Sequence, residues 1–159
     1  MINTDLLDKL NWQIGNEMGS AVLYKNMQYY FEKIGMVNLA AHYASQASGE
    51  YSHADGIANF ISERGDDADV SVKTFRIMDK NISAIVEQTY KHEKMITQFL
   101  YEVYEMACES EDPLTKVFIH DYLKEQIEEE ALSLTILDNL KLTSDMLIFD
   151  QRIKEIAKI

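Results

Sequence analysis

Apolar residues recur along the chain at spacings of three, four and seven, which place side chains on one face of an α-helix. Four long stretches carry this pattern, and a shorter one follows near the C-terminus. Their limits are marked by Gly35, Gly65, Asn81 and the pair Asp112-Pro113, residue types that end or begin helices. The pattern predicts helices over residues 5–34, 37–64, 82–109, 113–140 and 145–158.

Individual residues predict the first helix start and the buried faces of these helices. Thr4 is the expected cap of the first helix, because its side chain oxygen can accept from a free backbone N–H. The expected inward face of the fourth helix is Val117, Tyr122, Leu132, Ile136 and Leu140. The expected apolar face of the fifth is Met146, Leu147, Ile148, Ile153 and Ile156.

Connection lengths predict the topology. Short turns follow the first and third helices, whereas residues 66–80 form a long, charged and partly β-branched connection that does not fit a helix. Short turns join antiparallel neighbours, and a long crossover lets the second and third helices run parallel. We therefore expect an all-α fold in one domain, residues 1–159. It is an antiparallel four-helix bundle with one long crossover and a short fifth C-terminal helix.

Composition narrows the function classes. The formal net charge of −12 disfavours binding to nucleic acid or anionic lipid, and it attracts cations or simply keeps the chain soluble. No segment approaches the about 20 apolar residues of a membrane span, and the N-terminus lacks the pattern of a secretory signal. The single cysteine, Cys108, excludes an internal disulfide and a cysteine-rich metal site. We expect a cytoplasmic protein.

Polar residues interrupt the inward apolar positions of the long helices. Glu17 lies seven residues from both Leu10 and Tyr24 on the first helix, and Glu93 lies in a matching position on the third. Because both are near the middle of their helices, an antiparallel bundle brings them to one level. Buried carboxylates without a counter-charge would cost several kcal/mol each or take up protons.

The second and fourth helices each add an i, i+3 pair at that level. These pairs are Glu50 with His53, and Gln126 with Glu129. Four carboxylates would balance two divalent cations, and His53 would supply a neutral nitrogen ligand. Oxygen and imidazole donors without thiolate favour Fe or Mn, with Zn as an alternative. Redox chemistry with O₂ would single out iron.

The other histidines have a simpler interpretation. His42, His92 and His120 lie off the predicted inward faces, so we expect them on the surface or in subunit contacts. A single Glu-x-x-His on a glutamate-rich helix is common by chance. The metal interpretation depends on the combination of polar positions on four successive helices.

These residues lie in segments that resemble the bacterial non-haem ferritins. The segments are Leu10–Ile14 through Glu17 to Tyr24, Glu50–Ala54, Thr89–Glu93 and Glu125–Glu130, and the similarity covers nearly the whole chain. The resemblance implies a ferritin-like bundle and a shell of twenty-four subunits. It also implies ferroxidase activity, in which Fe(II) is oxidised by O₂ or hydrogen peroxide and ferric oxide is stored in the cavity. The fifth helix would line the four-fold channels.

The resemblance implies two iron ions per subunit. Glu17, Glu50 and His53 would bind the first ion, and Glu50 would bridge to the second. Glu93 and Glu129 would hold that second ion.

The resemblance also assigns residues around the irons. Gln126 would be a polar partner of the site, and Tyr24 would be the tyrosine beside it. Bacterioferritins bind haem through a methionine that follows the second-helix glutamate and carry histidine at the last ligand position. This chain has Tyr51 and Glu129 there, so no haem is expected.

Gly49 departs from the family pattern. Bacterial relatives commonly carry a carboxylate at this position, which joins the counterparts of Glu125, Glu128 and Glu129 in a third iron site. Glycine offers no ligand, so we expect a weak or empty third site. The glycine itself is explained either by drift or by close packing of two backbones.

Two other functions remain open from the sequence. A di-iron or di-manganese oxidase or oxygenase uses the same bundle, but usually with a second Glu-x-x-His, where this chain has Gln126 and Glu129. A non-catalytic helical interaction protein would carry the acidic residues on a solvated face. The size of the assembly in solution distinguishes a cage from both.

Overall fold

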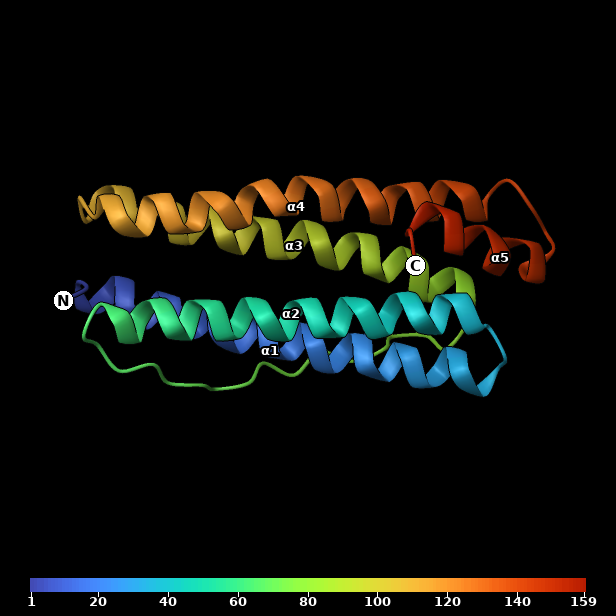
Figure 1. Cartoon of the computed structure of the whole chain (residues 1–159), viewed down its shortest axis with the longest axis horizontal. Coiled ribbons are helices and arrows are strands. Elements are labelled where there is room, and N and C mark those ends of the chain that lie inside the picture. Colours follow the sequence, from blue (N-terminus) through green and yellow to red (C-terminus); the bar gives the residue numbers. More distant parts are fainter.

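The computed structural model describes all residues, 1–159, and contains five α-helices and no strand (Figure 1). The helices are α1 (Thr4–Lys33), α2 (Val37–Glu63), α3 (Ile82–Glu109), α4 (Pro113–Leu140) and α5 (Met146–Ile156). Each end differs from the predicted limit by two residues at most. None of the helices combines the length and apolar character needed to span a membrane.

Helix caps match the prediction at two sites and correct it at a third. Asn81 accepts from the backbone N–H of Ala84 at 2.8 Å, and Asp112 accepts from that of Thr115 at 3.0 Å. The prediction of Thr4 as the first cap is wrong, because Thr4 is already helical and Asn3 is the cap. Asn3 and Thr4 are both suitable cap residues, and spacing alone did not fix which of them begins the helix.

The long helices form the expected bundle with one crossover. α1 and α2 run antiparallel, as do α3 and α4, while α2 and α3 run in the same direction (Figure 1). Gly35, in the turn after α1, has a φ of 79°, and Gly65, after α2, has a φ of 82°. Both values lie in the left-handed region that glycine adopts readily. Residues 66–80 then return along the bundle without helical structure.

The crossover is seated on two glycines of α1. The backbone N–H of Lys73 donates to the carbonyl of Gly15 at 2.9 Å. A Cβ added at Gly15 would overlap the carbonyl oxygen of Ser71, and one at Gly19 would overlap that of Lys73. Only residues without a side chain allow this close backbone contact, so Gly15 and Gly19 fix the path of the crossover over α1.

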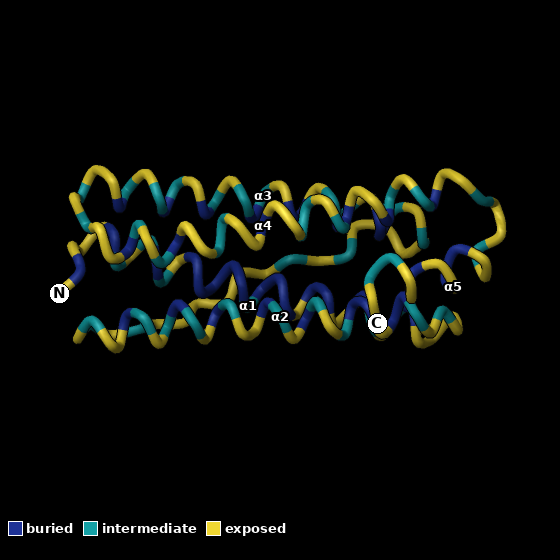
Figure 2. The backbone as a smooth tube through the Cα atoms, turned by 45° about the horizontal axis from the view of Figure 1, so that its top comes forward, coloured by how far each residue is buried: buried dark blue, intermediate teal, exposed yellow.

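The core has two apolar parts with a polar layer between them. One part includes Met27, Phe31 and Tyr43, and the other includes Leu10 and Ile57. Buried positions lie along the facing sides of the helices (Figure 2). Such dense apolar packing stabilises the bundle at both ends. It also encloses the polar residues that lie at mid-height.

Two predicted faces need correction. Val117 is exposed, and Ile119 takes its place in the core of α4, because the buried positions there follow Ile119, Gln126 and Ser133 at intervals of seven. On α5, Leu147 and Ile148 are exposed, while Phe149 is fully buried beside Ile153. In short or mixed apolar runs, residue type alone does not determine which side meets the bundle.

Candidate metal centre

Three potential metal ligands from α1 and α2 come together in the polar layer. Ligand atoms of Glu17, Glu50 and His53 all lie within 4.8 Å of one another. Glu17 and Glu50 are buried, and His53 is partly exposed. The sequence predicted this group, because Glu17 lies on the apolar side of α1 and Glu50 and His53 lie one turn apart on α2.

Glu17 is held by a hydrogen bond that leaves one oxygen free. The side-chain amide of Gln13 donates to Oε1 of Glu17 at 2.7 Å, and Asn16 donates to Gln13 at 3.5 Å. Oε2 of Glu17 is buried and no N–H or hydroxyl donates to it, so only a proton shared with the carboxyl group of Glu50 could satisfy it in the metal-free protein. A buried unpaired carboxylate oxygen is costly, and a cation would satisfy it. Sequence reasoning missed Gln13, although its position four residues before Glu17 was a usable signal.

Electrostatics in the layer favour protons or cations over free carboxylates. Burial, and then the charge of Glu93, raises the pKa of Glu50 to about 8. Burial, and then the charge of Glu50, raises the pKa of Glu17 well above its ordinary value. Without a cation, these groups therefore retain protons at neutral pH. A bound divalent ion would replace those protons.

Glu93 lies on the other side of the layer and is fixed by two donors. The hydroxyl of Tyr24 donates a short hydrogen bond to Oε1, and the amide of Gln126 donates to Oε2 at 3.0 Å. Burial raises the pKa of Glu93 to about 7, while these two hydrogen bonds oppose the rise. The predicted positions of Tyr24 and Gln126 beside the carboxylates agree with these contacts.

Glu129 lies at the edge of the layer. It is half-buried, and the amide of Gln46 donates to its Oε2 at 2.7 Å. Its charge is close enough to raise the pKa of both Glu50 and Glu93. Glu129 does not belong to the close group with Glu17, and Gln46 is a partner that the sequence did not indicate.

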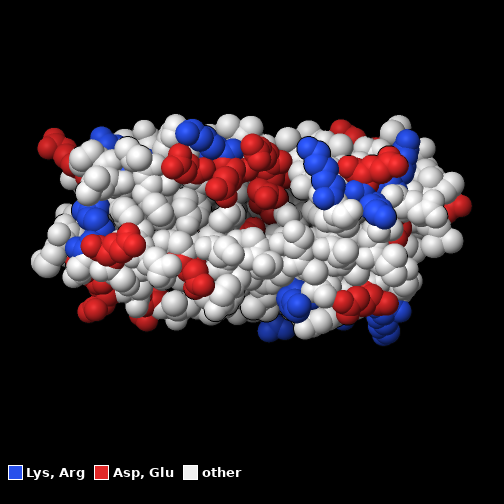
Figure 3. Space-filling view, viewed as in Figure 1, with Lys and Arg blue, Asp and Glu red and all other residues white.

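The residues predicted for a third site are not gathered into one. Oε2 of Glu125 lies 2.8 Å from Nε2 of His53, and Glu128 is exposed. No atom lies within 4 Å of a Cβ added at Gly49. Close packing therefore does not explain this glycine. In the view of Figure 1, acidic side chains gather over the middle of α4 (Figure 3).

The prediction of surface positions for His42 and His92 is wrong, whereas His120 is exposed as expected. Nε2 of His92 lies 2.8 Å from the hydroxyl of Ser20, and Phe75 of the crossover packs edge-on against the ring. Burial lowers the pKa of both His42 and His92 to about 4. The crossover covers His92, which a four-helix view of the sequence did not anticipate.

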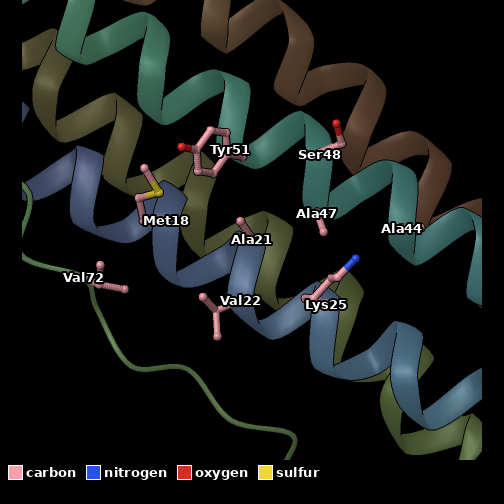
Figure 4. A pocket seen from close by; sticks show the side chains of 9 residues that line it. All are labelled: Met18, Ala21, Val22, Lys25, Ala44, Ala47, Ser48, Tyr51 and Val72. Atoms are coloured by element: carbon pink, nitrogen blue, oxygen red, sulfur yellow. The ribbon is translucent and has the colours of Figure 1, made fainter.

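A separate apolar pocket of about 380 Å³ lies between α1, α2 and the crossover. Tyr51 and Met18 line it, together with small and aliphatic residues and Lys25 (Figure 4). It contains no carboxylate or histidine, so it is not the place where the predicted ligands meet.

The donor set fits divalent cations. The polar layer contains three buried carboxylates, of Glu17, Glu50 and Glu93, and one histidine, His53. No buried lysine or arginine balances their charge. Oxygen and imidazole donors suit iron, manganese or zinc. The helices hold these donors in place through the apolar core on either side.

Comparison with known proteins places the fold in a family. The family model described as the ferritin-like domain of Ferritin matches residues 7–143. The chain belongs to the ferritin family. The bacterial non-heme ferritin of Bacteroides fragilis is 31% identical over 150 residues, 94% of each chain. That of Campylobacter jejuni is 30% identical over 164 aligned positions, 99% of this chain and 97% of the relative.

Solved ferritin structures agree with the bundle. An open pore ferritin from the hyperthermophilic archaeon Archaeoglobus fulgidus superposes with a TM-score of 0.91 and 32% identity. The match covers 96% of this chain and 98% of that one. The predicted resemblance and the predicted ferritin fold are therefore confirmed, while the roles of the individual residues stay predictions.

Proposed function

We propose that the chain is an iron-storage subunit with ferroxidase activity, built as one ferritin-like domain over residues 1–159. The observation that carries the proposal is the close group of Glu17, Glu50 and His53, in which no N–H or hydroxyl donates to Oε2 of the buried Glu17. A site of this charge and depth suits a cation better than water. Membership of the ferritin family makes Fe(II) the natural substrate.

Two Fe(II) ions would bind in each subunit. Glu17, Glu50 and His53 would hold the first ion, and Glu93 and Glu129, together with Glu50, would hold the second. Gln46 now holds Glu129 at the edge of the layer, so Glu129 would turn inward when the second ion arrives.

Tyr24 and Gln126 would act through Glu93. Their hydroxyl and amide donate to its two oxygens, which orients this carboxylate and stabilises its charged form. They thereby prepare Glu93 to bind a cation without contributing a charge of their own.

The reaction transfers one electron from each of two Fe(II) ions. O₂ accepts the two electrons with two protons and becomes hydrogen peroxide, or hydrogen peroxide accepts them with two protons and becomes water. Fe(III) then hydrolyses to ferric oxide, which a cage of twenty-four subunits stores in its cavity. We further propose that the protein is cytoplasmic. We also propose that it binds no haem, since Tyr51 follows Glu50 where bacterioferritins carry methionine.

The rival oxidase or oxygenase reaction is less well supported. An organic substrate would need a cavity beside the metal ligands. The apolar pocket between α1, α2 and the crossover is not lined by Glu17, Glu50 or Glu93.

Stopped-flow mixing of Fe(II) with O₂ tests the proposed site. His53→Ala and Glu17→Ala should each abolish the rapid absorbance rise, whereas His120→Ala, which removes an exposed histidine, should keep it. Size-exclusion chromatography should show all four proteins at roughly half a megadalton, twenty-four times the 18.4 kDa of one chain. Wild-type oxidation rates in both site variants would place the chemistry elsewhere.

A further inference from the structure

His53 is contacted through both of its ring nitrogens. Nδ1 lies 3.2 Å from Oε2 of Glu50, on the side of the proposed metal centre. Nε2 lies 2.8 Å from Oε2 of Glu125 in α4. The imidazole therefore links the buried carboxylates of α1 and α2 to an acidic side chain of the neighbouring helix.

Tyr122, one turn before Glu125, holds the same histidine from another side. Its hydroxyl donates to the backbone carbonyl of His53 at 3.0 Å, and the two ring centroids lie 5.3 Å apart. Gly56 makes this contact possible, because a Cβ there would overlap the Tyr122 hydroxyl. The position of the ring is thus set by α4 as well as by α2.

The contact with Glu125 determines which nitrogen can bind a metal. An ionised carboxylate only accepts hydrogen bonds, and a neutral imidazole carries one N–H. When Glu125 accepts the N–H of Nε2, the lone pair of the neutral ring is on Nδ1, which lies on the side of Glu50. Histidine ligands commonly donate their second N–H to a carboxylate, which fixes the ring and strengthens the ligand.

We propose that Glu125 is a positioning residue that orients His53 through Nε2, so that Nδ1 binds the first metal ion. The proposal rests on the proposed function of the site. It assigns Glu125 to the first metal position instead of a third one. Consistent with this, Gly49 offers no side chain for a third site and Glu129 is paired with Gln46.

Anaerobic titration of the assembled, metal-free protein with Co(II) tests the assignment through the dissociation constant and the visible absorbance of the bound ion. Glu125→Ala should weaken the first equivalent by about 10- to 100-fold. Glu125→Gln keeps an oxygen that accepts from Nε2 and should stay much closer to the wild type. Asp121→Asn removes the same charge from an exposed site one turn earlier on α4 and should change little.

Two outcomes would overturn the proposal. Wild-type affinity in Glu125→Ala would show that His53 needs no such partner. Equal losses in Glu125→Ala and Glu125→Gln would show that Glu125 acts by its charge alone. His53→Ala separates this proposal from the function of the site: if that variant binds the first Co(II) normally, the proposed metal centre itself is wrong.

A crystal structure with Zn(II), which has no redox chemistry, gives a direct check of the geometry. The ion should lie on Nδ1 of His53, with Glu125 on Nε2. An ion bound to Nε2 would contradict the assignment, whatever the affinities.

Discussion

The carboxylate of Asp150, in α5, accepts a hydrogen bond of 2.8 Å from the backbone N–H of Leu39, in the first turn of α2. The same carboxylate accepts from the backbone and side-chain nitrogens of Asn38 at 3.2 and 3.1 Å. Met36, at the N-cap of α2, supplies no side-chain acceptor. The cap of α2 is therefore provided by the fifth helix. The negative charge of Asp150 also lies at the positive end of the α2 dipole, which is a favourable interaction.

Removing this cap should destabilise the bundle without changing the chemistry. Asp150→Ala should cost about 1–2 kcal/mol, because a cap is lost and buried N–H groups are left without an acceptor. Truncation after Lys141 should lower the melting temperature further and reduce iron retention. The initial oxidation rate should stay near that of the wild type in both. Gln151→Ala, at an exposed neighbour, is the control, and an unchanged melting profile in Asp150→Ala would contradict the capping role.

The crossover contacts predict opposite effects for two glycine substitutions in helices. Gly15→Ala should destabilise the protein, because its Cβ overlaps the Ser71 carbonyl and the crossover backbone must move. Gly49→Ala should stabilise it by up to about 1 kcal/mol, since alanine favours the helix and nothing lies within 4 Å of the new Cβ. Thermal unfolding of the metal-free proteins measures both. Similar shifts in the two variants would mean that the crossover is not seated on Gly15.

The sequence predicted those parts of the site that depend on spacing within one helix. Glu17 and Glu93 were found because intervals of seven place them among buried apolar positions. Gln46 and Glu125 were not identified as partners of Glu129 and His53, because those contacts depend on how α2 and α4 face each other. The capping of α2 by Asp150 is a similar case, since no local pattern connects residues 111 positions apart.

Stability of the metal-free protein should depend on pH through Glu50. The pKa of this carboxyl is about 8 in the fold against an ordinary value of 4.5. Its proton therefore stabilises the fold fully below pH 4.5, and that contribution is lost as the pH rises through 8. The linked change is at most about 1.4 kcal/mol per pH unit for one proton.

Melting temperatures between pH 5 and 9, in the presence of a chelator, measure this effect. The wild type should lose stability relative to Glu50→Gln as the pH increases, because glutamine has no proton to release. Glu17 and Glu93 titrate in both proteins, but their pKa values depend on the charge of Glu50, so the difference measures Glu50 together with this coupling. A constant difference across this range would show that Glu50 is ionised in the metal-free fold.

Gly49→Glu should create a third metal position that the wild type lacks, although a weaker one than the first two, because Glu125 and Glu129 keep their partners. In the wild type, position 49 offers no ligand, Glu125 lies on His53, and Glu129 is bound by Gln46. Anaerobic titration with Fe(II) should therefore show tight binding that ends near two equivalents per subunit. A Cβ at position 49 has no neighbour within 4 Å, and glutamate also favours the helix more than glycine does. The variant should fold at least as well as the wild type and bind close to three equivalents, whereas Gly49→Gln, of similar size but uncharged, should remain near two. Three equally tight equivalents in the wild type would refute this account, because Glu125, Glu128 and Glu129 would then form the third site without help from position 49.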